Sequence, residues 1–158
     1  MSIAAADVPV RFVEIGSWRL ATLADLGDLR GHVHRTLTGA PLPPDRHLDA
    51  APERIVLVAS ELATNALRHG RPPALVRLLS DGREFVVDVV DHSPERPPVI
   101  DPHRPPGAGG FGLQLARRAA REVGWFTTAT GEKHVWARFE VPLFRAGTGA
   151  RSALALLA

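Results

Sequence analysis

The chain has 158 residues, a length suited to a single domain, and 45% of them are hydrophobic, which is enough for a substantial core. The absence of cysteine excludes a disulfide framework and a cysteine-based zinc site, and the net charge of +2 does not demand a nucleic-acid partner. With no apolar run long enough to cross a bilayer and no positively charged N-terminal region, we expect a cytoplasmic protein without a membrane or direct nucleic-acid partner.

The first half of the chain predicts one strand and two helices. Residues 11–14 can form a short strand, and apolar side chains at helical spacing indicate a first helix over residues 21–37. A turn over residues 39–44 separates it from a second helix over residues 52–69, for which Gly70 is a suitable C-terminal stop. The apolar stripe of this second helix consists of Ile55, Val58, Ala59, Leu62 and Ala66.

A hairpin and a long irregular segment follow the second helix. The β-type runs 74–79 and 85–90 flank Asp81-Gly82, a pair typical of a tight turn between antiparallel strands. Residues 92–108 contain six prolines, so they can form neither a central strand nor the interior of a helix. Because long loops in compact domains often have functions, we expect this segment to be a lid that orders when a ligand binds.

The last part of the chain predicts a third helix over residues 113–123 and strands over residues 125–130 and 134–141. The element order β-α-α-β-β-loop-α-β-β suits an α+β fold, a two-layer α/β sandwich in which about three helices cover one face of a mixed sheet. We assign residues 1–145 to this single domain and expect residues 146–158 to form a flexible tail.

Glu61 and Asn65 are the first candidate site residues. They are one helical turn apart on the same face of the second helix. A carboxylate and a carboxamide so placed can share a divalent cation and a water molecule, and Mg²⁺ in such sites is completed by substrate phosphates. The alternative is an ordinary solvated face of an amphipathic helix, because short motifs also match by chance.

Two further features predict a nucleotide site when they are taken together with that helix. Asp91 ends an apolar strand and precedes Ser93, and a carboxylate there can accept a hydrogen bond from an exocyclic amine. Gly110 and Gly112 lie at the start of the third helix, where backbone amides and the helix dipole favour phosphate. Alone, such an aspartate more often starts a turn and such glycines more often form a tight turn.

In this order, the three motifs closely resemble the boxes of the Bergerat-fold (GHKL) ATP-binding superfamily. Residues 61–69 (ELATNALRH) resemble its N box, residues 89–94 (VVDHSP) its G1 box and residues 110–113 (GFGL) its G2 box. The resemblance spans residues 11–141. It is strongest to the stand-alone anti-sigma-factor serine kinases, which share the Asp-x-Ser sequence and a late Val-Trp strand similar to Val135-Trp136.

The resemblance implies ATP and Mg²⁺ as cofactors and assigns roles to individual residues. Asn65 would bind the Mg²⁺ ion that bridges the ATP phosphates, Glu61 would be the catalytic base, and Asp91 would accept a hydrogen bond from the adenine amine. Three positions depart from the family pattern: Ser93 replaces a glycine, Phe111 replaces a small or basic residue, and His134 stands where many relatives have a threonine beside the phosphates. The implied nucleotide-binding residues are Asn65, Asp91, Ser93, Gly110, Gly112 and Leu113.

The function implied by the resemblance is that of an ATP-dependent serine/threonine protein kinase that acts as an anti-sigma factor in transcription regulation. Its partners would be a sigma factor and an anti-sigma-factor antagonist protein carrying the phosphorylated serine, and the protein could form a homodimer. Two alternatives remain open. One is a non-catalytic ATP-binding adaptor, and the other is a histidine-kinase-type catalytic domain acting in trans.

Overall fold

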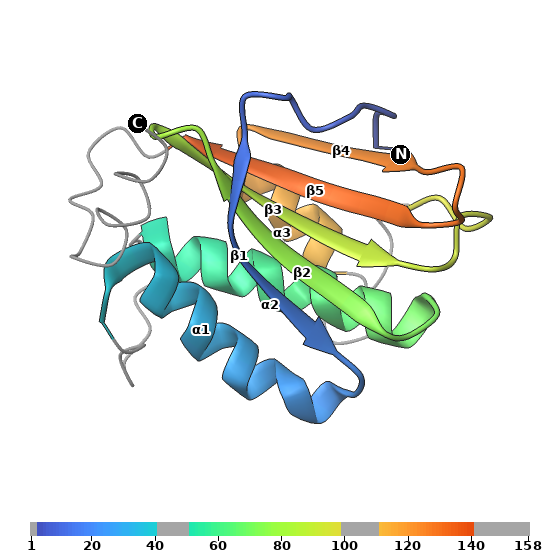
Figure 1. Ribbon diagram of the computed structural model, residues 1–158, viewed down its shortest axis with the longest axis horizontal. Helices are drawn as coiled ribbons and strands as arrows, with labels where there is room; N and C mark the ends of the chain where they lie inside the picture. Colours follow the sequence, from blue (N-terminus) through green and yellow to red (C-terminus); the bar gives the residue numbers. More distant parts are fainter. Residues whose placement is uncertain (1–2, 41–50, 99–110, 141–158) are drawn as a thin grey trace.

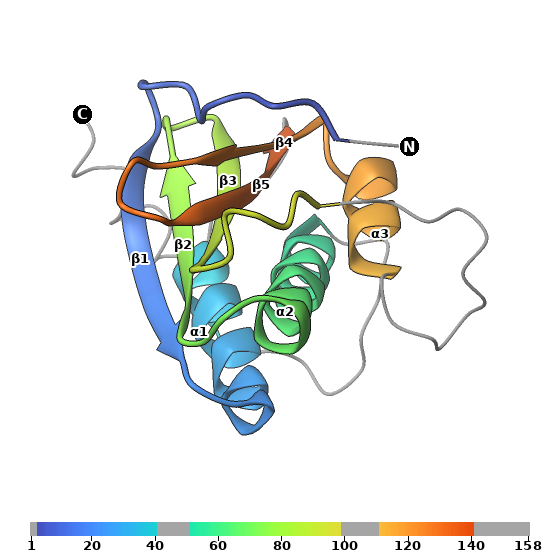
Figure 2. The same cartoon turned by 90° about the vertical axis from the view of Figure 1, so that its right-hand side faces the viewer.

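The computed structural model describes residues 3–40, 51–98 and 111–140, and it contains one sheet with helices packed on one of its faces (Figures 1 and 2). Within these residues, no helix is both long enough and apolar enough to cross a membrane. The predicted tail, residues 146–158, lies outside the described residues. The elements are β1 (Val13–Leu20), a short 3-10 helix (Leu23–Asp25), α1 (Leu26–Thr38), α2 (Ala51–His69), β2 (Ala74–Ser80), β3 (Glu84–Asp91), α3 (Phe111–Ala119), β4 (Glu122–Thr127) and β5 (Lys133–Glu140).

The sheet has five strands in the order β1-β2-β3-β5-β4, and all neighbouring strands are antiparallel. The segment before β1 adds a parallel bridge between Ala5 and Trp125 at the β4 edge, which makes the sheet mixed. Helices α1, α2 and α3 lie on one side of this sheet, as Figure 2 shows. The predicted α+β sandwich is therefore confirmed.

The main core lies between the sheet and the helices, and it follows from the alternation of side chains along each strand. On the face toward the helices, alternate residues of β2, β3 and β5 are apolar and buried, and they pack against the predicted stripe of α2. The same alternation places Asp91 and Lys133 on this face, where they are directly opposite each other in the β3–β5 pair. The apolar strand residues are Ala74, Val76, Leu78, Phe85, Val87, Val89, Val135, Ala137 and Phe139.

A smaller cluster covers the outer face, the face of the sheet that points away from the helices. Leu79, Val86 and Trp136 are buried there beneath Phe12 and the preceding N-terminal segment. Trp136 Nε1 donates a hydrogen bond to the carbonyl oxygen of Ala6 at 2.7 Å, which fixes this segment on the sheet. The N-terminal segment thus shields an apolar face that would otherwise be exposed.

Several predicted boundaries were wrong, among them the start of the first helix, which is at Leu26, and the end of β4, which is at Thr127. The first strand extends to Leu20 instead of ending at Glu14, because a bulge between Glu14 and Gly16 interrupts the alternation of period two. The third helix ends at Ala119, and residues 122–123 belong to β4, because the backbone leaves the helix and Arg121 N donates to Arg138 O of β5.

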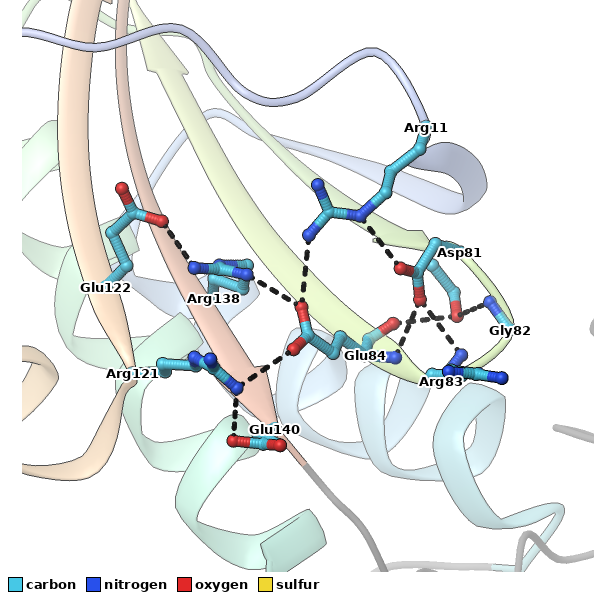
Figure 3. A network of polar contacts seen from close by, with 10 residues as sticks. Arg11, Asp81, Gly82, Arg83, Glu84, Arg121, Glu122, Arg138 and Glu140 are labelled. Carbon is cyan, nitrogen blue, oxygen red and sulfur yellow. Dashed lines mark hydrogen bonds and ion pairs between the residues drawn. The ribbon is translucent and has the colours of Figure 1, made fainter.

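A network of charged side chains joins neighbouring segments at the end of the sheet where β3 begins and β5 ends (Figure 3). Glu84 and Glu140 are directly opposite each other, an arrangement that is unfavourable for like charges. Arg121 contacts both carboxylates, and Arg138 Nη1 lies 3.0 Å from Glu84 Oε2. Arg11 extends the network from Glu84 to Asp81 in the β2–β3 turn.

We expect Asp81 to make the free energy of unfolding depend on pH in the acidic range. Partial burial opposes its ionisation, but hydrogen bonds from the backbone amides of Glu84 and Arg83, together with the Arg11 guanidinium, outweigh burial and lower the pKa of Asp81 below 3.8. A carboxyl group whose pKa is lowered in the folded state adds stability above its unfolded pKa and loses it as the pH falls. Between about pH 5 and about pH 2.5, wild type should therefore lose more free energy of unfolding than Asp81→Asn. Urea unfolding at both pH values measures this difference, and equal losses would contradict it.

Candidate nucleotide-binding site

Two polar side chains on one face of α2, those of Glu61 and Asn65, have no partner within the described residues. Both side chains are only half buried, while the neighbouring Leu62 and Ala66 are buried in the core. Within residues 3–40, 51–98 and 111–140, neither Glu61 nor Asn65 has a hydrogen-bond or ion-pair partner on its side chain. The helix therefore presents one carboxylate and one carboxamide that can still accept bonds from a ligand.

The donor set fits Mg²⁺ held together with phosphates better than it fits a metal enclosed by the protein. The described parts of the chain contain no group of three His, Cys, Asp or Glu side chains that could hold a metal ion. Mg²⁺ prefers oxygen ligands, keeps several water molecules and is commonly held by one or two protein groups plus substrate phosphates. The carboxamide oxygen of Asn65 can supply such a ligand.

Asp91 ends β3 and is almost fully buried, with 3% of its surface exposed. Its Oδ1 accepts hydrogen bonds from both the backbone amide and the hydroxyl of Ser93, the former at 2.8 Å. Its Oδ2 lies 3.1 Å from Nζ of Lys133. The predicted candidates Asp91 and Ser93 therefore lie together, and both are part of one buried polar cluster.

Gly70 brings the end of α2 against this cluster. A Cβ atom at Gly70 would lie 2.6 Å from Asp91 Cγ and 2.6 Å from the carbonyl oxygen of Ala66. The helix does end at His69 as predicted, but Gly70 does not have a positive φ angle. Gly70 is therefore required for its lack of a side chain and not for its backbone conformation. The missing Cβ atom lets the helix that carries Asn65 approach the carboxylate of Asp91.

The segment that follows Asp91 is irregular in its described part, residues 92–98, as its prolines predict. The guanidinium of Arg96 donates to the carbonyl oxygen of His69 at 3.1 Å, and Arg71 forms an ion pair with Glu95 at 2.9 Å. These contacts fix the start of the predicted lid to the end of α2. Residues 99–108 of the predicted lid lie outside the described residues.

Lys133, which no sequence motif indicated, belongs to the buried polar cluster around Asp91, whereas His134 does not. Lys133 is the only lysine of the chain and is 6% exposed on the face toward the helices. His134 is on the outer face, where its Nδ1 donates to buried Asp88 at 2.9 Å and its ring stacks on Phe126. Because side chains alternate along β5, His134 points away from the helices while its neighbour Lys133 points toward them.

The phosphate-binding candidates are only partly described. Gly110 lies outside the described residues, and the structure places Gly112 and Leu113 in the first turn of α3. This helix packs against α2 (Figure 1), so its N-terminal turn and the helix with Asn65 belong to the same layer. The binding of phosphate by Gly110, Gly112 and Leu113 stays a prediction.

Comparison with known proteins provides independent information on the family. The model of the family described as "Histidine kinase-like ATPase domain" matches residues 20–139. The NMR structure of the histidine kinase domain of the E. coli osmosensor EnvZ is similar with a TM-score of 0.43 and 17% identity, over 89% of this chain and 94% of that chain. No curated protein matches the sequence. Because the family model covers well over half of the chain, the protein belongs to the histidine kinase-like ATPase domain family.

Proposed function

We propose that the protein binds Mg²⁺–ATP between α2, the end of β3 and the start of α3, and that it transfers the γ-phosphoryl group to a serine of another protein. The observation that supports this most directly is the pair Glu61 and Asn65, whose side chains have no partner within the described residues and lie on the helix that ends against Asp91. Phosphoryl transfer requires mainly positioning and charge neutralisation, and such a site can supply both.

Each residue has one task in this proposal. The carboxamide of Asn65 holds Mg²⁺, which neutralises charge on the phosphates when it is bound. Asp91 accepts a hydrogen bond from the adenine amine, and Ser93 orients the Asp91 carboxylate through its two hydrogen bonds. Gly110, Gly112 and Leu113 bring backbone amides to the phosphates. Glu61 accepts the proton of the attacking hydroxyl group.

At the level of biology, we propose an anti-sigma factor that binds a sigma factor and phosphorylates an anti-sigma-factor antagonist protein. This assignment is supported by the stand-alone kinase pattern of the sequence, namely Asp91-x-Ser93 and Val135-Trp136. A histidine-kinase-type domain acting in trans fits the same family, and the two differ in their product. Phosphoserine survives acid treatment and phosphohistidine does not, so acid lability of the product formed from radiolabelled ATP and a panel of antagonist proteins would exclude the serine kinase.

The first test is Mg²⁺-dependent nucleotide binding. Asn65→Ala should keep the fold, because Asn65 is half buried and its side chain has no partner within the described residues. It should also remove the tightening of ATP binding by Mg²⁺, which we expect to be roughly tenfold or more for a lost metal ligand. Isothermal titration of ATP with and without Mg²⁺ measures this tightening, and circular dichroism checks that the fold is kept.

Arg54→Ala is the matched control, since Arg54 is an exposed residue near the start of the same helix. This variant should bind Mg²⁺–ATP as wild type does. If wild type binds neither ATP nor ADP at millimolar nucleotide with Mg²⁺, the proposed enzyme activity is wrong. If it binds nucleotide but phosphorylates no antagonist protein, the serine-kinase proposal is wrong and the two alternatives, the adaptor and the histidine-kinase-type domain, are left.

A further inference from the structure

All three N–H donors of the buried Lys133 ammonium group have acceptors within the protein. An ammonium group has three N–H donors. Nζ of Lys133 lies 3.1 Å from Asp91 Oδ2, 3.1 Å from Ser93 Oγ and 3.0 Å from the carbonyl oxygen of Arg96. Each donor is therefore matched by an oxygen atom, and Lys133 has no N–H left for a ligand.

The carboxylate of Asp91, in contrast, keeps one acceptor position. An ionised carboxylate offers about four lone-pair positions. Two of these, on Oδ1, accept the amide and the hydroxyl of Ser93, and one on Oδ2 faces Lys133. No donor from residues 3–40, 51–98 or 111–140 occupies the last position, on Oδ2, so the cluster can accept a hydrogen bond from a ligand but cannot donate one from Lys133.

Lys133 is also the cation that balances Asp91. The two other cations that contact this part of the described chain are engaged elsewhere, since Arg96 donates to the His69 carbonyl oxygen and Arg71 pairs with Glu95. Burial of an ionised carboxylate is costly unless it is paired and hydrogen-bonded. Lys133 therefore compensates the burial of the Asp91 carboxylate and holds it in place as an acceptor.

We infer that Lys133 is a specificity-determining residue of the nucleotide site, because it holds Asp91 as a buried acceptor and leaves no free donor beside it. This inference rests on the proposed function. A base with an exocyclic amine, such as adenine, complements the remaining acceptor. A base with a carbonyl group at that position, such as hypoxanthine, directs an oxygen atom at a carboxylate and leaves polar groups unpaired, which a buried site rejects strongly.

The first experiment compares ATP with ITP, in which a carbonyl group replaces the adenine amine, on the wild-type protein. We expect ATP to bind at least about tenfold more tightly, since a hydrogen bond to a charged group is lost. Equal affinities would overturn the inference and the adenine-binding role of Asp91, while the proposed Mg²⁺–ATP binding and phosphoryl transfer would stand. Failure of both nucleotides to bind would overturn the proposed function itself.

The second experiment uses Lys133→Met, which keeps an unbranched side chain but removes the charge and the three donors. Without the ammonium group, Asp91 Oδ2 loses the partner that holds it in place and compensates its burial, so the carboxylate distinguishes an amine from a carbonyl group less sharply. The ratio of ATP to ITP affinity should then fall about tenfold. A merely structural role of Lys133 would weaken both nucleotides equally and leave the ratio unchanged, which would refute the inference.

The matched control is Arg96→Ala. It loosens the same segment by removing the bond to the His69 carbonyl oxygen, yet it keeps Lys133 and the Arg96 backbone oxygen that Lys133 contacts. The ATP to ITP ratio should stay at the wild-type value in this variant. If circular dichroism shows that Lys133→Met does not fold, Lys133→Gln, which is also neutral but polar, takes its place with the same expected fall.

Discussion

Glu61→Ala should bind Mg²⁺–ATP almost as wild type does and lose phosphotransfer by about 10²- to 10⁴-fold, the contribution that a positioned general base makes. Binding should survive because Glu61 is half buried and its side chain has no hydrogen-bond partner within the described residues that its removal would leave unpaired. Transfer should fail because Glu61 is one helical turn from Asn65 on the same face, so a group bound at Asn65 lies within its reach. Initial rates with radiolabelled ATP and an antagonist protein, measured at saturating ATP, report the loss.

Two control variants distinguish base catalysis from a general disturbance of α2. Glu61→Gln keeps the shape of the side chain but cannot take up a proton, so it should be as inactive as Glu61→Ala. Arg68→Ala changes an exposed residue of the same helix and should have little effect. An unchanged rate in Glu61→Ala would remove Glu61 from the mechanism and leave nucleotide binding as the established part of the proposal.

The fold could be predicted largely from the sequence because its elements carry regular patterns. The stripe of α2 from Ile55 to Ala66 and the hairpin around Asp81-Gly82 depend only on local periodicity and turn chemistry. The length of β1 could not be predicted, because the bulge at Glu14 and Gly16 depends on the pairing with β2. Local patterns therefore locate the elements, and pairing partners decide where they end.

The site could be predicted as a set of residues, but not as a network of contacts. The motifs identified Asp91 and Ser93, which the structure brings together, yet they gave no sign that Lys133 would pair with Asp91. This pairing depends on the β3–β5 register, which is a tertiary property. A signal was nevertheless present, because Lys133 alternates with Val135 and Ala137 on the buried face of its strand, where an unpaired lysine is rarely found.

The second large effect that we expect is at Gly70. In Gly70→Ala, the new Cβ atom would lie 2.6 Å from Asp91 Cγ, 2.7 Å from its Oδ2 and 2.6 Å from the Ala66 carbonyl oxygen. Two of these atoms belong to a buried ion pair and one to the helix backbone, so none can move freely. We expect a loss of about 1–3 kcal/mol in the free energy of unfolding, as for other overpacked sites.

Nucleotide binding should suffer in Gly70→Ala as well, because the helix that carries Asn65 and the carboxylate of Asp91 would be pushed apart. Loss of one hydrogen bond to a charged group corresponds to roughly a tenfold to hundredfold weaker affinity for ATP.

Gly31→Ala is the control: a Cβ atom there has no neighbour within 4 Å, and Gly31 is in the interior of α1. Alanine should therefore stabilise the protein at Gly31 by roughly 0.5–1 kcal/mol and leave ATP binding unchanged. Urea unfolding and ATP titration of both variants separate a general effect of alanine from the close approach at Asp91. A Gly70→Ala protein with wild-type stability and ATP affinity would show that the end of α2 does not hold this carboxylate in place.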